Sequence, residues 1–111
     1  MRDPRNALFP FLVKETATAR EAIAAKLYKL DVVKTAIIEA ATRGERAVRI
    51  SDRGLVVDLR GTEAAKTLAD WIGQNGMTLE WLERQAERPN GLKVTIGEPV
   101  ISWGHEAYSF S

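Results

Sequence analysis

The stretch TAREAIAAKLYKLDVVKTAIIEAATRGE, residues 18–45, decides the class of fold. Thr18 and Glu21 have the spacing of a capping box, in which two side chains satisfy backbone N–H groups at a helix start. Apolar residues then recur at steps of three and four up to Gly44, which suits a helix end: Ile23, Leu27, Leu30, Val33, Ile37 and Ala41. The pattern predicts one long amphipathic helix, although Asp31 leaves open a break near Leu30 followed by a second helix.

Strand-like patterns follow this helix. Residues 46–51 alternate between apolar and polar side chains, and residues 55–59 are rich in β-branched ones, so the turn SDRG between them predicts a β-hairpin. Thr62 is a suitable N-cap for another helix, which is expected to end at Asn75-Gly76.

The segment MTLEWLERQAER, residues 77–88, fits both a helix and a strand. Leu79, Leu82 and Ala86 have helical spacing, whereas Met77, Leu79 and Trp81 alternate as in a strand. Both alternatives remain open from periodicity alone. Beyond the turn at Pro89-Asn90-Gly91, further strands are predicted over residues 92–96, 99–103 and 107–111, with an interruption from Gly97 to Pro99.

Composition indicates one soluble globular domain. The chain has 111 residues, of which 45% are hydrophobic and 28% charged, and its formal net charge is +1. No apolar run is long enough to span a membrane, and no membrane association is expected. We predict an α+β fold over residues 14–111, in which a long N-terminal helix and a second helix pack on a small, mainly antiparallel sheet.

Residues 1–13 are predicted to form an extended N-terminal arm, because Pro4 and Pro10 remove backbone donors. The arm is apolar, so it is expected either to pack on its own domain or to dock on a neighbouring subunit. Aromatic side chains also occur at the other end of the chain. The predicted partner-binding residues are Leu8, Phe9, Phe11, Leu12, Tyr108 and Phe110.

No catalytic, cofactor-binding or metal-binding residue is predicted. The chain has no cysteine and one histidine, His105, whose neighbour Glu106 would point to the opposite side of a strand. The isolated glycines stand where elements should end, and they form no phosphate-binding pattern. The sequence therefore favours a protein that is not an enzyme and has no cofactor.

Five arginines gather between residues 43 and 60, together with three acidic residues. A solvated face with ion pairs is the favoured interpretation, and contact with nucleic acid or an acidic partner is the alternative. Trp71, Trp81 and Trp103 are expected in the core, with an interface role as the second interpretation.

Four short motifs in this order resemble small α+β virion-associated proteins of tailed bacteriophages that have a C-terminal Ile-Ser-Trp strand. The resemblance covers residues 19–104 and rests on IIEAATRGERAVRI (37–50), LADWIGQNGMTLEW (68–81), LKVTI (92–96) and VISWG (100–104). It implies a strand directly after Asn75-Gly76, and it brings no catalytic residues with it.

The resemblance implies a non-enzymatic structural protein of a phage particle, such as a capsid cement or head–tail accessory subunit. Its expected partners are other virion proteins, namely capsid or connector subunits, and a second copy of itself. It would be made in the host cytoplasm and end in the virion. The alternative is a small regulatory protein that binds nucleic acid or a host protein, although nucleic acid is the less favoured partner given the balanced charge.

Overall fold

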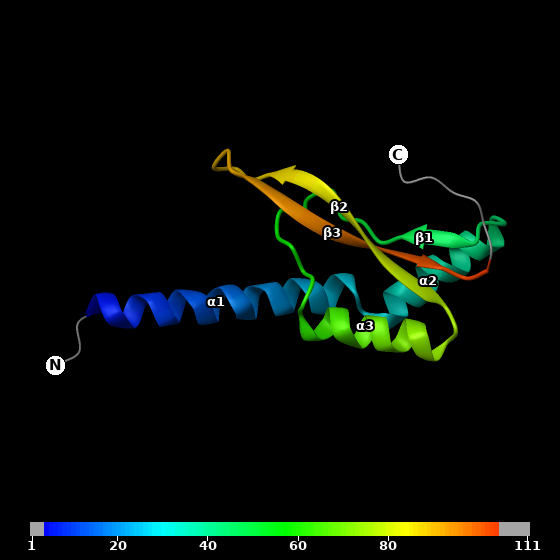
Figure 1. Ribbon diagram of the computed structural model, residues 1–111, viewed down its shortest axis with the longest axis horizontal. Coiled ribbons are helices and arrows are strands. Elements are labelled where there is room, and N and C mark those ends of the chain that lie inside the picture. Colours follow the sequence, from blue (N-terminus) through cyan, green and yellow to red (C-terminus); the bar gives the residue numbers. More distant parts are fainter. Residues whose placement is uncertain (1–3, 105–111) are drawn as a thin grey trace.

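The computed structural model describes residues 4–104, with side chains from residue 7 onward. Within this part the predicted α+β class is confirmed, because helices cover a small antiparallel sheet (Figure 1). The elements are α1 (Pro4–Leu27), α2 (Leu30–Thr42), β1 (Ala47–Arg49), α3 (Glu63–Gln74), β2 (Thr78–Glu87) and β3 (Lys93–Ser102). His105, Tyr108, Phe110 and the strand predicted over 107–111 lie outside the described residues.

The prediction of an extended arm over residues 1–13 is wrong from Pro4 onward, because α1 is helical from there to Leu27. Pro4 occupies the first helical position, where its missing N–H would have no intrahelical acceptor and its fixed φ suits a helix. Pro10 removes one backbone hydrogen bond, but strong helix formers such as Leu8 and Leu12 flank it. The helix therefore begins well before the capping box at Thr18.

The single helix expected over residues 18–44 is interrupted at Tyr28 and Lys29, in agreement with the alternative of a break near Leu30. Lys29 has φ −56° and ψ 127°, which is an extended conformation, and α2 starts directly after it. The buried ring of Tyr28 meets Trp81 edge to face, with 6.0 Å between ring centroids. The change of direction thus lets α1 pack against α3 while α2 packs along β1.

The ambiguous segment 77–88 forms the strand β2 (Thr78–Glu87), as the resemblance implied. β2 pairs along its whole length with β3, and β1 pairs with the other side of β3, so the antiparallel order is β1-β3-β2. The predicted hairpin between 46–51 and 55–59 is wrong, because β1 pairs with β3 and residues 55–59 form no strand. Burial of Leu55 and Leu59 in the core is the reason, since a surface hairpin would leave part of this apolar run exposed.

β3 continues through Gly97 and Pro99, where the sequence predicted an interruption. Pro99 accepts a hydrogen bond from the Ile50 N–H at 3.0 Å, so its own nitrogen faces the same edge of the strand. β1 ends at Arg49, and no strand beyond it requires an N–H from Pro99. The loop between β1 and α3 takes the place of a longer β1, because the Asp58 carboxylate accepts the Gly97 N–H at 3.1 Å.

The core lies between the sheet, the inner half of α1, α2 and α3. The core interpretation of the tryptophans is confirmed, because Trp71, Trp81 and Trp103 are all partly buried against it. Its fully buried large side chains include Leu59, Leu68, Ile72, Ile96, Ile101 and Val33.

Candidate functional site

The part of α1 that precedes Arg20, called the outer half here, projects from the body of the domain (Figure 1). The predicted partner-binding residues of this segment are exposed, by 49% for Leu12 and 72% for Phe9, with Leu8 and Phe11 between these values. Val13, an apolar residue of the same segment that is not among the predicted partner-binding residues, is exposed as well. The segment therefore does not pack on its own domain, and docking on a neighbouring molecule stays a prediction.

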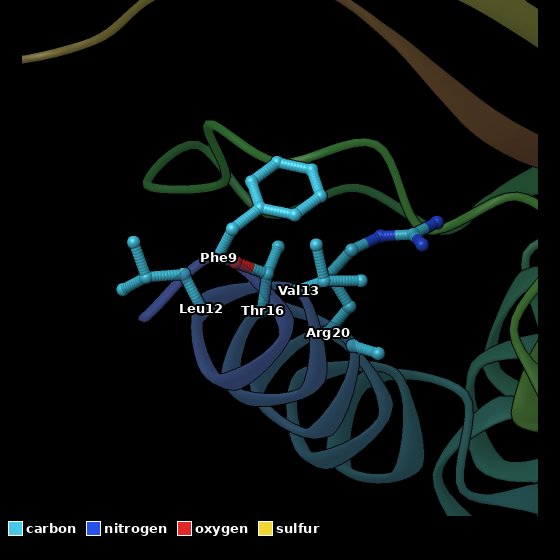
Figure 2. Close-up of a pocket in the computed structure, with 6 residues that line it drawn as sticks. Phe9, Leu12, Val13, Thr16 and Arg20 are labelled. Atoms are coloured by element: carbon cyan, nitrogen blue, oxygen red, sulfur yellow. The ribbon is translucent and has the colours of Figure 1, made fainter. Parts of the chain in front are cut away.

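One side of this projecting helix forms a shallow groove of about 410 Å³, lined by Phe9, Leu12, Val13, Thr16, Ala17 and Arg20. Figure 2 shows the side chains of Phe9, Val13 and Arg20 rising from the same side of α1. Steps of three and four residues continue this stripe to Ala24, which is completely buried. The groove is thus the outward extension of the face by which α1 packs on its own domain.

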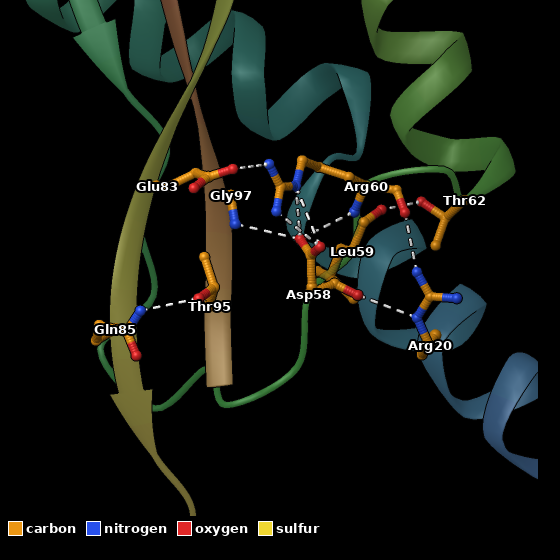
Figure 3. A network of polar contacts seen from close by, with 9 residues as sticks. All are labelled: Arg20, Asp58, Leu59, Arg60, Thr62, Glu83, Gln85, Thr95 and Gly97. Atoms are coloured by element: carbon orange, nitrogen blue, oxygen red, sulfur yellow. Dashed lines mark hydrogen bonds and ion pairs between the residues drawn. The ribbon is translucent and has the colours of Figure 1, made fainter. Parts of the chain in front are cut away.

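The inner end of the groove is fixed by Arg20. Its guanidinium donates to the backbone carbonyl oxygens of Asp58 at 3.0 Å and Arg60 at 2.9 Å (Figure 3). At the next residue, the Glu21 carboxylate accepts the N–H of Glu63 at 2.7 Å, at the start of α3. These contacts fix α1 to the loop before α3 and to the start of α3. The projecting half therefore extends from a part of α1 that is firmly attached to the domain.

The loop that holds Arg20 is itself ordered by charge (Figure 3). The Arg60 guanidinium forms ion pairs with Asp58 at 3.1 Å and with Glu83 of β2 at 2.8 Å. Burial raises the pKa of Asp58, but hydrogen bonds from Arg60 and from the Gly97 N–H outweigh it and leave the pKa below its ordinary value. The pKa of Arg60 is raised by its hydrogen bonds to Asp58 and Glu83. Asp58 therefore stays ionised at neutral pH.

A second group of charges surrounds Glu98 of β3, which is only 1% exposed. Ser51 donates to Oε2, the Arg84 guanidinium lies 3.1 Å from the same oxygen, and the Arg49 Nε donates to Oε1 at 3.0 Å. Burial raises the pKa of Glu98, yet the hydrogen bonds from Ser51, Arg49 and Arg84 leave it below the ordinary value. Because both carboxylate oxygens of Glu98 already accept from neighbouring side chains, the carboxylate stabilises the fold by joining these side chains.

Sequence reasoning missed Glu98, because it stands between Gly97 and Pro99 in a stretch interpreted as an interruption. It also missed Thr16, Ala17 and Arg20 as groove residues. The signal for these three was the apolar stripe of α1, which continues upstream of the capping box at the same spacing.

The arginines between residues 43 and 60 favour the interpretation as ion pairs. Arg43 pairs with Glu45, Arg49 with Glu98, and Arg60 with Asp58 and Glu83. Their positive charges are thus offset by neighbouring carboxylates, which weakens the case for a phosphate-binding surface.

The low pKa of Glu98 makes stability depend on pH. The Glu98 carboxyl binds protons more weakly in the folded than in the unfolded chain. Its contribution to folding stability is therefore complete above its unfolded-state pKa of about 4.5, and this contribution is lost as pH falls through its lower pKa in the folded state. Glu98→Gln cannot titrate. We expect urea unfolding between pH 6 and about pH 3 to show a steeper loss of stability for wild type than for Glu98→Gln; parallel curves would contradict this.

Among residues 4–104, no group of acidic or histidine side chains could hold a metal ion. In the same part of the chain, no helix is long and apolar enough to cross a membrane. The sequence matches no protein-family model and no curated protein, and no solved structure matches this fold. The projecting apolar half of α1 is the candidate functional site, because it combines the exposed apolar side chains with the groove.

Proposed function

We propose that this chain is a non-enzymatic structural protein of a tailed-phage particle, a capsid cement or head–tail accessory subunit that docks through the outer half of α1. The observation that carries the proposal is the exposure of Leu8, Phe9, Phe11 and Leu12 on a helix held away from its own domain. Soluble proteins rarely present such a continuous apolar surface unless it binds a partner.

The architecture also suits a docking subunit. A helix that is apolar on every side is typical of a buried environment, and α1 meets this description only over its projecting half. The other half is fixed to the loop before α3 by Arg20 and Glu21. A partner would therefore bind a helix that is already formed, with little conformational entropy left to lose.

Particle association tests this function. In cells that produce the particles, tagged wild-type chain is expected to copurify with them through a density gradient, whereas the double variant Phe9→Asp and Leu12→Asp is expected to be lost from them. The matched control is Leu92→Asp, since Leu92 is another exposed leucine but lies outside α1. Absence of wild-type chain from the particles, or unchanged association of the double variant, would refute the proposal.

A further inference from the structure

We infer that the free edge of β2, the side that does not pair with β3, binds an extended, basic segment of another protein. The segment adds to the sheet as a fourth strand next to β2. This surface is separate from α1, so the inference goes beyond the proposed function and does not depend on it.

The backbone groups of the free edge follow from the hydrogen bonds of β2 with β3. The Arg88 N–H donates to the Leu92 carbonyl oxygen at 2.8 Å, one step beyond the last residue pair of the two strands. Because backbone groups alternate in direction along a strand, even-numbered residues of β2 face β3 and odd-numbered residues face away. The residues that face away are Leu79, Trp81, Glu83, Gln85 and Glu87. Within residues 4–104, the backbone N–H and C=O groups of these five form no hydrogen bond.

Nothing along this edge prevents another strand from pairing. Natural edge strands are usually short, or they carry lysine, proline or a bulge that keeps other strands away. β2 has ten residues, and its sequence TLEWLERQAE contains no lysine, proline or glycine. Its register with β3 is continuous from Thr78 to Glu87, so no bulge interrupts it. The opposite edge strand, β1, has only three residues, and β2 is therefore the edge at which the sheet can be extended.

The exposed charges of β2 are carboxylates. Glu80, Glu83 and Glu87 are all exposed, and the side chain of Glu83 is visible in Figure 3. Glu83 pairs with Arg60. Glu80 and Glu87 form no ion pair within residues 4–104, although Lys93 lies opposite Glu87 on β3. An added strand with lysine or arginine opposite the glutamates gains cross-strand ion pairs, whereas an acidic strand or a nucleic acid is repelled.

The arginines next to these glutamates face the domain instead of the edge. Arg84 pairs with the buried Glu98 at 3.1 Å, and Arg88 donates to the Val56 carbonyl oxygen at 3.1 Å. The β2 strand of a second copy therefore brings further glutamates to the edge and no unbound arginine to meet them. A basic segment of a different protein fits the edge better than a second copy of β2.

The spacing of the glutamates predicts the pattern of the occupant. Every strand pair of this sheet is antiparallel. In an antiparallel fourth strand, the residues opposite Glu87, Glu83 and Glu80 occupy positions i, i+4 and i+7. The first two lie on one face of the sheet and the third lies on the other, because side chains alternate. We therefore expect lysine or arginine at these three positions of the occupant.

A designed peptide tests the pairing on the purified chain. The probe has ten residues of valine and threonine, with lysine at its first, fifth and eighth positions and with an acetylated and an amidated end. In the chain alone, the five outward amides are expected to exchange hydrogen faster than the even-numbered amides of β2 that are bonded to β3. Addition of the probe is expected to slow exchange of the five by about 10-fold or more, as measured by NMR.

Charge reversal on the chain tests the selection of a basic occupant. Glu80→Lys with Glu87→Lys is expected to weaken binding of the probe by about 10-fold at low salt. The same variant is expected to bind a probe with glutamate at the first and eighth positions. The matched control is Glu15→Lys with Glu39→Lys, which changes the net charge equally at exposed positions of α1 and α2. Circular dichroism should confirm that both double variants fold.

Methylation of the probe separates strand pairing from charge attraction alone. In the antiparallel pair, the N–H groups of its third and seventh residues face β2, whereas those of its fourth and sixth residues face solvent. N-methylation at the third and seventh residues is expected to abolish the protection of the five amides. N-methylation at the fourth and sixth residues is expected to retain it.

Four results would overturn the inference. They are no protection of the five amides at about 1 mM probe, equal binding of both methylated probes, equal weakening in the reversed variant and its control, or protection of the five amides in the chain alone. The last result would indicate that a second copy occupies the edge. None of these measurements involves the outer half of α1, so the proposed docking through α1 is tested separately.

Discussion

Glu98→Ala is expected to lower the free energy of unfolding by about 3–5 kcal/mol, the usual cost of removing one partner from a buried ion pair. The Glu98 carboxylate is 1% exposed and accepts from Arg49 and Ser51, with Arg84 paired to it as well. Its removal leaves the partly buried Arg84 guanidinium without its carboxylate, together with an unfilled space below the sheet. Urea unfolding at neutral pH measures the difference.

The matched control for this experiment is Glu80→Ala. Glu80 lies on β2. The side chains of Glu80 and Glu98 lie on one face of the sheet and Trp81 lies on the other, but unlike Glu98, Glu80 is exposed. Its replacement is expected to change the free energy of unfolding by no more than about 0.5 kcal/mol. A loss below about 1 kcal/mol for Glu98→Ala would contradict the role given to this carboxylate.

Leu59→Ala is expected to lower the free energy of unfolding by about 2–5 kcal/mol. Leu59 lies in the loop between β1 and α3, yet it is 0% exposed and belongs to the largest buried side chains of the core. Truncation there leaves a cavity that the loop cannot easily fill, because the side chains of Arg20 and Thr62 donate to carbonyl oxygens of the same loop. Chemical denaturation again provides the measurement.

The control for Leu59 is Leu92→Ala, which removes the same atoms from a side chain that is 61% exposed at the turn between β2 and β3. We expect a change of less than about 0.5 kcal/mol there. If both variants lose equally little, residues 55–59 are a surface connection and the assignment of this loop to the core is wrong.

Local patterns predicted much of the chain correctly. Thr62 caps α3 through its hydroxyl oxygen, which accepts the Ala65 N–H at 3.2 Å, and α3 gives way to a turn at Asn75-Gly76 as expected. The apolar character of Leu8 to Leu12 predicted a docking surface; the structure leaves these side chains exposed, and docking itself stays a prediction. Such features depend on neighbours within one or two turns, which a sequence displays directly.

The failures share a different cause. Residues 55–59 have strand-like side chains, but the competing demand for buried apolar area in the core places Leu55 and Leu59 there as part of a loop. Pro99 predicted an interruption of the strand, yet β3 continues through it. The short β1 ends before Pro99, so no neighbouring strand needs an N–H at this position. Each outcome was decided by a segment about 40 to 50 residues away in sequence, as the separations of 39 for Asp58 with Gly97 and 49 for Arg49 with Glu98 illustrate.

The sequence by itself determined that this protein is helical over most of residues 18–44, has a helix capped by Thr62, belongs to the α+β class and carries an uncharged apolar segment at residues 7–13. Only the tertiary structure decided that this segment is a projecting helix, that its groove ends at Arg20, and that Glu98 is a buried charge. The reason is physical: periodicity and capping are properties of neighbouring residues, whereas exposure and ion pairing depend on which distant segments cover a side chain.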